Sequence, residues 1–151
     1  MERDEPTVGP GERVKAMAAM EALLRIWRQA VDCFPGDDLE TILVYLTVAA
    51  ASSSSHLRDP EIVARLDDAP LPDHLHRPTS GRAVAEATGL ARETVRRRID
   101  ALVASGRLAR DSRGVRTVSG TITHARNLEF VRFLTREMTL ASDRLRRFDP
   151  A

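Results

Sequence analysis

The chain contains few aromatic residues, one lysine and one cysteine. Because Cys33 is the single cysteine among 151 residues, an internal disulfide framework is excluded and a reducing compartment is favoured. Aromatic residues make up 4% of the chain, so any hydrophobic core depends on Leu, Val, Ile and Ala. The longest apolar run, residues 42–51, has about half the length that a membrane span needs, and we expect no membrane association.

The sequence also lacks the usual marks of secretion and catalysis. Residues 1–5 are polar and mostly acidic, unlike a secretory signal, so we expect a cytoplasmic protein. The sequence has no glycine-rich phosphate loop, nucleophile elbow or paired-carboxylate spacing. We therefore expect no enzyme activity, and no cofactor is predicted.

Charge is distributed unevenly, although the formal net charge is only +1. Residues 1–76 hold 7 basic and 14 acidic residues, whereas residues 77–116 hold 10 arginines and 4 acidic residues. A basic segment within a near-neutral chain is typical of a site for a polyanion. The alternative is arginine scattered over solvated surfaces, since 22 of the 23 basic residues are arginine. Charge alone does not decide between the two.

Hydrophobic periodicity predicts helices before the basic segment. We expect a disordered tail over residues 1–11, then a helix beginning at Glu12. The next helix, residues 38–56, is apolar on most sides, which predicts the central helix of the core. A short helix at 60–66 and a proline-rich connection complete an N-terminal region that spans residues 12–76.

Residues 77–120 carry the most specific pattern in the chain. The expected elements are, in order, a helix at 81–88 capped by Thr79 or Ser80, a turn at Gly89, a helix at 91–105 and a β-hairpin at 107–118. Two short helices joined by a tight glycine turn and followed by a basic hairpin form a winged helix-turn-helix. The predicted fold is therefore mainly α, with this unit flanked by helical extensions on its N-terminal side and at 121–151.

The helix at 91–105 has the composition of a major-groove reader, since apolar residues line one side and long donors the other. Arg96 and Arg97 are placed to bind guanine edges bidentately, while Arg98 lies nearer the flank and is expected to contact phosphate. Arg113, in the turn of the hairpin, is expected to enter the adjacent minor groove. The full set of predicted DNA contacts is Arg92, Glu93, Thr94, Arg96, Arg97, Arg98, Arg110, Arg113 and Arg116.

The stretch at 85–99, AEATGLARETVRRRI, resembles the winged helix-turn-helix of bacterial transcription regulators. It is similar to the reading heads of the GntR and Crp families, in which a small residue and a glycine precede Thr-Val and an arginine-rich helix. The resemblance covers about 40 of the 151 residues and implies sequence-specific binding of duplex DNA. One departure is Ala91, where such motifs often carry a capping Ser or Thr, so the helix is expected to begin without a side-chain cap.

A long amphipathic segment follows, and a reading head does not need a helix of that length. Its apolar positions between Ile122 and Phe148 are Leu128, Val131, Phe133, Leu134, Met138, Ala141 and Leu145. Because such regulators commonly bind paired half-sites, we expect a homodimer held by the first helix, the last helix or both. The alternative is a last helix that folds back to complete the core of one monomer.

Other sites and partners are less well supported. His74 and His76 beside Asp73 have poor spacing for metal ligands, so no metal site is predicted. The aromatic residues that could line an effector pocket, but are more simply read as core, are Trp27, Phe34 and Tyr45. A winged helix can also dock a protein partner, as an adaptor or antagonist of a regulator, and its third helix is then usually less basic.

Overall fold

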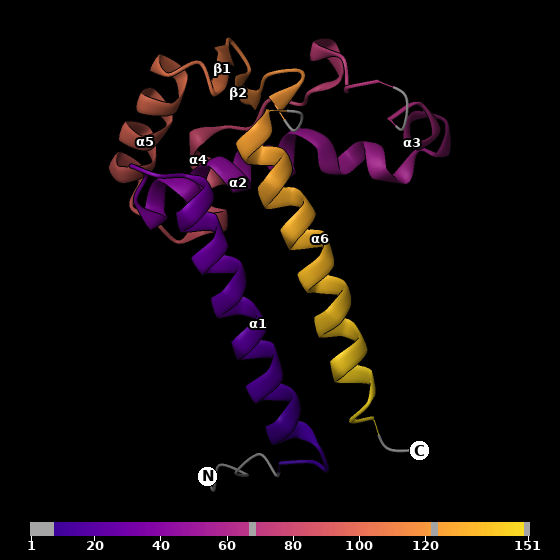
Figure 1. The fold of residues 1–151 in the computed structure, drawn as a ribbon. Helices are drawn as coiled ribbons and strands as arrows, with labels where there is room; N and C mark the ends of the chain where they lie inside the picture. The colour runs from indigo at the N-terminus through magenta and orange to yellow at the C-terminus, as the bar shows by residue number, and fades with distance from the viewer. Residues whose placement is uncertain (1–7, 67–68, 122–123, 150–151) are drawn as a thin grey trace, which may run out of the picture.

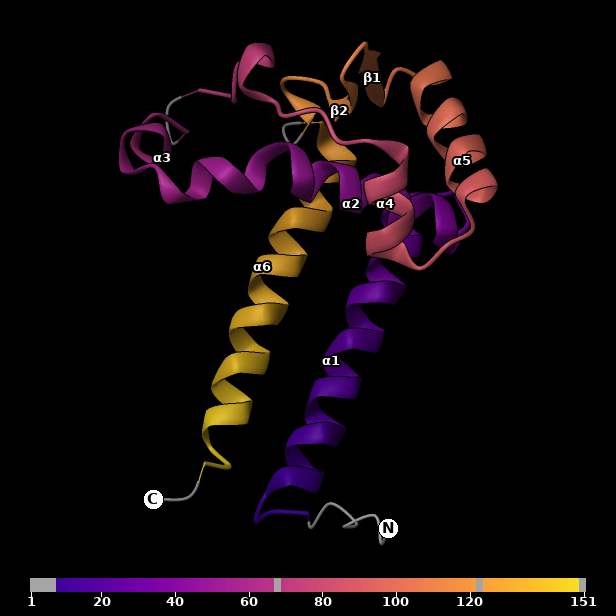
Figure 2. The same ribbon diagram turned by 180° about the vertical axis from the view of Figure 1, so that it is seen from behind.

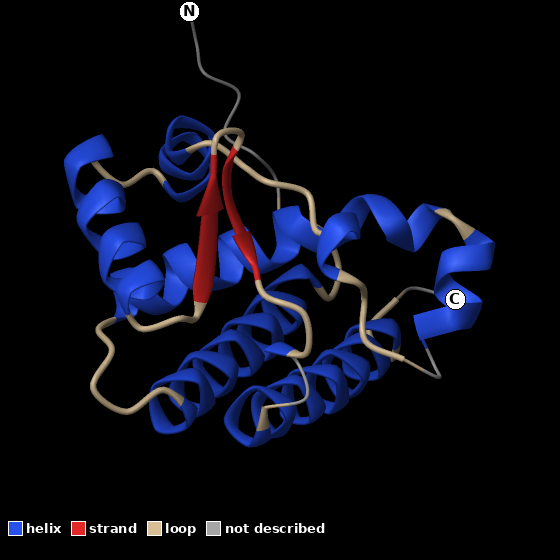
Figure 3. Ribbon diagram, turned by 90° about the horizontal axis from the view of Figure 1, so that it is seen from above, coloured by secondary structure: helices blue, strands red, loops and turns tan. Residues whose placement is uncertain are grey.

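The computed structural model describes residues 8–66, 69–121 and 124–149. The described part of the chain is mainly helical, with one two-stranded antiparallel hairpin (Figures 1 and 3). The α-helices and strands are α1 Glu12–Cys33, α2 Leu39–Ser53, α3 Pro60–Leu66, α4 Gly81–Thr88, α5 Arg92–Ala104, β1 Leu108–Asp111, β2 Gly114–Thr117 and α6 Ala125–Arg146. Short 3-10 helices cover Ser54–Arg58 and Asp73–Leu75.

The elements form two parts, which we call the head and the stalk (Figures 1 and 2). The head runs from α2 to β2, and the stalk consists of α1 and α6. These two helices lie side by side and antiparallel: the chain runs toward the head in α1 and away from it in α6. Both described ends of the chain therefore lie at the far end of the stalk, where Lys15 forms an ion pair with Asp149.

The core of the head is built around α2, as its apolar composition predicts. Ile42, Val44 and Val48 are fully buried, and the weak amphipathicity of this helix reflects neighbours on several sides. The side chains that pack with them come from α4, α5, the hairpin and α6: Val84, Val95, Ile99, Leu102, Leu108, Val115 and Phe130. α2 thus supports α4 and α5 and also joins the head to α6.

Side-chain caps set the beginnings of α2 and α4. Asp38 accepts a 2.8 Å hydrogen bond from the Thr41 backbone N–H, and Ser80 accepts one of 3.1 Å from Ala83. Gly89 then ends α4 in the left-handed conformation, with φ of 71°. The N-cap of α5 is Ala91, which provides no side-chain cap, as the sequence predicts.

The hairpin pairs Leu108 with Thr117 at its base and Asp111 with Gly114 at its tip. The chain just before α4 joins this pair through a single antiparallel bridge between Thr79 and Val115. The hairpin is therefore tied to the start of α4 as well as to the end of α5.

The stalk differs from the sequence-based expectation in its details. The predicted start at Ile122 falls outside the described residues, and α6 begins at Ala125. Its buried side chains are Phe130 and Glu137, neither of which belongs to the predicted apolar stripe. Glu137 is buried because it accepts two hydrogen bonds from Arg25 of α1, 2.9 and 2.6 Å long. Most of the predicted tail, residues 1–7, also falls outside the described residues.

No helix among the described residues is long and apolar enough to cross a membrane.

Candidate nucleic-acid interface

The arginine-rich helix α5 packs on α2 and α4 through one side and exposes the opposite side. Val95, Ile99 and Leu102 are buried at steps of three and four residues, as expected for a helix docked along one face. Arg92, Arg96 and Arg97 are exposed, and Thr94 is half-buried. The sequence therefore predicted correctly which side of this helix faces the core.

A groove lies between α5 and the hairpin. It has a volume of about 510 Å³, and α5, the first turn of α4 and the hairpin all contribute to its walls. Its arginines are Arg82, Arg92, Arg96, Arg110 and Arg113. Five guanidinium groups along one groove, with Asp111 as the only acidic residue among the described lining residues, make it a basic surface.

Arg96 is held between two carboxylates of its own helix. It donates hydrogen bonds of 2.9 and 2.6 Å to Glu93 and one of 2.8 Å to Asp100. The Arg96 guanidinium holds the pKa of Glu93 below its ordinary value, chiefly through these hydrogen bonds. Arg96 therefore faces the groove with its charge partly neutralised. In the chain without DNA, Glu93 forms an ion pair with Arg96.

Two other arginines of α5 keep their charge available. Neither Arg92 nor Arg97 forms an ion pair with any residue that the structure describes. Arg97 is exposed, while Arg92 opens the first turn and lines the groove. These two side chains are the least committed donors of the helix.

Arg98 turns toward α2 instead of the outer surface. Its guanidinium forms ion pairs with Asp38 and, at 2.9 Å, with Glu40 at the start of α2. Only 28% of its side chain is exposed. Arg98 thus fixes α5 against α2, and the predicted phosphate contact would require it to leave or share these carboxylates.

The three hairpin arginines differ in exposure. Arg113, next to the tip, has 74% of its side chain exposed and lies 3.7 Å from Asp111. Arg110 reaches across to Asp100 of α5 at 2.7 Å. Arg116 has 20% exposed and pairs with Asp73 at 3.2 Å, so it attaches the hairpin to the preceding connection. Of the three, Arg113 is the one that extends freely from the hairpin.

Sequence reasoning missed a further arginine that organises the head. Arg107 pairs with Asp37 and stacks over the ring of Tyr45, 4.7 Å from its centroid. Its guanidinium also lies over Phe34, at 5.4 Å. Asp37 lies 70 residues earlier in the sequence, and the two rings are similarly distant, so no local pattern could have revealed these contacts.

His74 and His76, which have poor spacing for metal ligands, lie in different surroundings. His76 is buried between the Thr117 hydroxyl, 2.8 Å from Nδ1, and the Leu71 carbonyl, 3.0 Å from Nε2. His74 is exposed, and Asp73 is engaged by the backbone N–H of Ser119. Within residues 8–66, 69–121 and 124–149, no three potential ligands cluster as a metal site would require. Cys33 is buried and free.

Comparison of the chain with protein-family models, with curated proteins and with solved structures finds no match.

Proposed function

We propose that the protein is a bacterial-type transcriptional regulator that binds duplex DNA through a winged helix-turn-helix. In this proposal α5 enters the major groove and the β1–β2 hairpin, the wing, contacts the adjacent groove. The observation that carries it is the groove lined by five arginines between α5 and the hairpin. We also propose a cytoplasmic location, where the single Cys33 stays reduced.

The first turn of α5 supports a phosphate contact. Ala91 has no side chain that can accept a hydrogen bond, so the first backbone N–H groups of the helix lack a side-chain partner. Helix N-termini of this kind bind phosphate through N–H groups and the helix dipole. Arg92 is exposed beside this turn and adds a positive charge. A DNA strand passing the helix end would meet both.

Base recognition falls to Arg97 and Arg96. Arg97 is exposed and unpaired among the described residues, so it can present its two-nitrogen edge to guanine without first losing a partner. Arg96 is pre-oriented by Glu93 and Asp100, which limits its motion but also reduces its charge. Non-specific attraction to the DNA phosphates therefore comes mainly from Arg92, Arg97 and Arg113. The ion pairs of Arg96 orient its guanidinium and reduce its contribution to the net charge.

A homodimer is proposed from an unpartnered face of α1. Met17, Met20, Leu24, Trp27 and Val31 follow steps of three, four, three and four residues, the spacing of a coiled-coil seam. Trp27 is half-buried against the core of its own chain, whereas the other four are exposed. Leu24 and Met17 have 68% and 67% of their surface exposed. The opposite side of α1, with Ala22 and Ala30 buried, is the side that packs within the monomer.

A second copy of α1 is the occupant that fits this stripe. A heptad seam is self-complementary, so two copies can pair along it with a twofold axis. The exposed apolar residues of α6, by contrast, are scattered: Met138 and Leu140 lie on different sides of the helix. Of the arrangements expected from the sequence, we favour pairing through α1, with α6 folded back on its own chain.

The experiment that tests the proposed function is selection from a randomised duplex library with the full-length protein. A sequence-specific dimer enriches an inverted repeat, with the two half-sites related by the protein's twofold axis. Arg97→Ala, run in parallel, is expected to lose preference at one position of each half-site. A library without any enriched sequence after repeated rounds contradicts sequence-specific binding.

A second candidate function is docking of a protein partner, as an adaptor or antagonist of a regulator. The favouring observation is that Arg96, Arg98 and Arg110 are already engaged by carboxylates of the chain. A surface with internally balanced charge suits a protein partner better than a polyanion. The two candidates differ in salt response, because phosphate contacts make DNA affinity fall steeply with added salt.

A further inference from the structure

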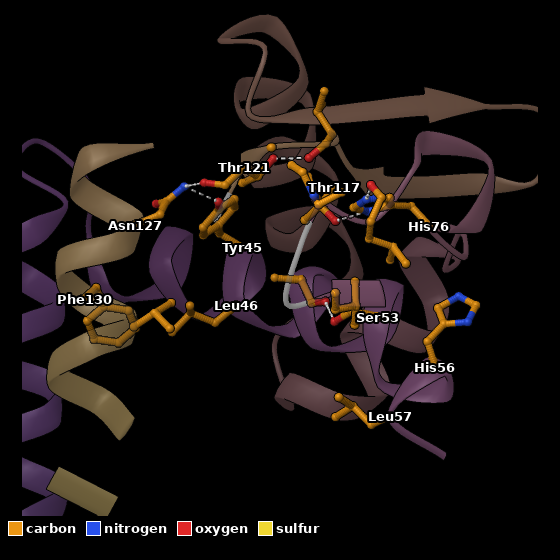
Figure 4. A pocket seen from close by; sticks show the side chains of 18 of the residues that line it. Tyr45, Leu46, Ser53, His56, Leu57, His76, Thr117, Thr121, Asn127 and Phe130 are labelled. Atoms are coloured by element: carbon orange, nitrogen blue, oxygen red, sulfur yellow. Dashed lines mark hydrogen bonds between the residues drawn. The ribbon is translucent and has the colours of Figure 1, made fainter. Parts of the chain in front are cut away.

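The head contains a second cavity, of about 470 Å³, and none of its described lining residues belongs to α5 (Figure 4). It lies between α2, the connection that follows α3, the segment after β2 and the first turns of α6. Its volume is within the range of small-molecule sites in proteins. The apolar side chains of its walls include Phe34, Leu46, Leu57, Leu71, Phe130 and Val131.

The described residues of the cavity wall are apolar or uncharged polar side chains and two histidines. Among the described residues that line it there is no Asp, Glu, Lys or Arg, although such residues make up 30% of the chain. Moving an ion into such a site would cost its hydration without providing a counter-charge. The cavity therefore suits a neutral molecule with a largely apolar body.

A polar group is available at one end of the cavity. The Asn127 side-chain amide donates hydrogen bonds to the Tyr45 hydroxyl oxygen at 3.0 Å and to the Thr121 carbonyl at 2.6 Å (Figure 4). The Tyr45 hydroxyl thus accepts one bond, and its own proton has no acceptor among the described residues. Burial raises the pKa of Tyr45, so the phenol stays protonated and can donate at neutral pH.

The two histidines of the lining are less available. Nε2 of His56 is bonded to the Leu75 carbonyl, and both ring nitrogens of His76 have partners, Thr117 and Leu71. These bonds hold the connection against α2 and the hairpin and so shape the cavity wall. The Tyr45–Asn127 end is therefore a place where a ligand can gain a hydrogen bond.

We propose that this cavity binds a small neutral organic molecule whose apolar body fills the space between Leu46, Leu71 and Phe130. A carbonyl or other hydrogen-bond acceptor of the ligand takes the proton of the Tyr45 hydroxyl. From the sequence, Trp27, Phe34 and Tyr45 were the aromatic residues that could line an effector pocket. Phe34 and Tyr45 line this cavity, but Trp27 is not among its lining residues.

The cavity shares a wall with the wing, which gives a route to regulation. Thr117, the last residue of β2, lines the cavity, bonds His76 through its hydroxyl and donates a 3.2 Å hydrogen bond from its backbone N–H to the Ser52 hydroxyl oxygen. A ligand that displaces this strand end changes how the hairpin sits beside α5. This coupling rests on the proposed DNA-binding function, whereas ligand binding itself does not.

Binding is tested with N-phenylnaphthylamine, a neutral probe that fluoresces in apolar surroundings, and with its charged analogue anilinonaphthalene sulfonate. The full-length protein is expected to bind the neutral probe saturably and the sulfonate about tenfold more weakly or worse, since the site offers no counter-charge. Two variants fill the cavity from opposite walls, Ala49→Phe on α2 and Val131→Phe on α6. The matched control is Ala64→Phe, at an exposed position of α3.

Both filling variants are expected to weaken the neutral probe about tenfold or more, with the control unchanged. Their circular dichroism and melting temperature show whether they fold. If either folded filling variant binds the probe as tightly as the parent, the cavity is not the site and the proposal is overturned. Equal affinity for the neutral and the sulfonated probe overturns the neutral-ligand assignment.

The Tyr45 contact is tested by competition between acetonaphthone and ethylnaphthalene, which match in shape but differ in a carbonyl. The parent protein is expected to prefer acetonaphthone, and Tyr45→Phe to lose that preference while it still binds N-phenylnaphthylamine. A preference that persists in Tyr45→Phe overturns the assigned contact. Duplex DNA affinity is then measured with and without saturating probe: probe binding without DNA binding refutes the proposed function alone, and DNA binding without probe binding refutes the cavity alone.

Discussion

Thr79 and Val115 exchange two backbone hydrogen bonds, 2.8 and 2.9 Å long, which fasten the hairpin to the residue just before the cap of α4. The bridge fixes the hairpin and the two helices α4 and α5 as one unit. It also leaves no room at Gly114, because a Cβ atom there would lie 2.4 Å from the Thr79 carbonyl oxygen. Gly114 has φ of 143°, a conformation that other residues rarely adopt.

Gly114→Ala is expected to break this bridge, since both the backbone conformation and the contact with Thr79 oppose a Cβ atom. Urea unfolding should show a loss well above the roughly 1–2 kcal/mol that positive φ alone costs. The control is Gly36→Ala, where φ is 90° but the added Cβ meets nothing within 4 Å. DNA affinity should fall for Gly114→Ala only, and equal destabilisation of the two variants would contradict the clash.

Arg97→Ala and Arg96→Ala are each expected to cost roughly 1–3 kcal/mol of affinity for a selected site and to relax its sequence preference. On random duplex, Arg97→Ala should lower affinity more than Arg96→Ala, because the Arg96 charge is already shared with Glu93 and Asp100. Fluorescence anisotropy provides both measurements. Arg132→Ala, at an exposed position of α6, is the control. Unchanged affinity in both helix variants would mean that α5 is not the recognition helix.

Arg113→Ala is expected to weaken binding by a similar amount on all sequences. The side chain extends from the hairpin tip and has only a distant partner in Asp111, so it meets the backbone or the minor groove instead of a specific base. The slope of log affinity against log salt should become less steep by about one phosphate contact. A loss confined to one operator sequence would instead indicate base reading by Arg113.

Leu24→Glu is expected to convert the dimer into a monomer. The substitution places a charge at the centre of the heptad stripe of α1, where two copies are proposed to meet. Sedimentation equilibrium at tens of micromolar should show a dimer for the parent chain and a monomer for the variant. Met138→Glu, at an exposed position of α6, is the control, and this variant should stay dimeric. A monomeric parent chain, or a monomeric control, would contradict pairing through α1.

Asp38→Ala is expected to lower stability at neutral pH by about 0.5–2 kcal/mol, the usual cost of losing a side-chain cap. In the folded protein the pKa of Asp38 is lowered, first by the Thr41 hydroxyl and backbone N–H and further by Arg98. The stabilisation is therefore fully present above the unfolded carboxyl pKa of about 3.9 and is lost as pH falls through the lower folded value.

Urea unfolding of parent and variant across pH checks this prediction. The difference between them should be constant near neutrality and shrink in the acidic range. Asp38→Ser keeps a capping oxygen but no titratable group, so it should retain much of the stability without this pH dependence. A difference that stays constant down to strongly acidic pH would contradict the role of the ionised carboxylate.

Much of the head follows from local sequence signals. Caps at Asp38 and Ser80 and the turn at Gly89 each act within a few residues, so the helix bounds could be predicted closely. The outer side of α5 was likewise clear from three- and four-residue spacing. Elements whose geometry is set by their own residues are therefore the ones that the sequence reveals.

Contacts between distant segments were not predictable in this way. The burial of Glu137 depends on Arg25, more than a hundred residues earlier, and the inward turn of Arg98 depends on Asp38 and Glu40. A charged residue facing a helix flank looks the same in sequence whether it meets solvent, DNA or a carboxylate. The candidate DNA-binding arginines could thus be identified from the sequence. Only the fold distinguishes those that form ion pairs with carboxylates from those that do not.

DNA binding by this protein is tested by a fluorescence-anisotropy titration of the full-length chain against random-sequence duplex DNA at two salt concentrations. We expect submillimolar binding at low salt that falls sharply at higher salt, because Arg92, Arg97 and Arg113 replace counterions at the phosphates. No binding at low salt, or binding that salt does not change, would contradict DNA binding and would favour a protein partner for the arginine-lined groove.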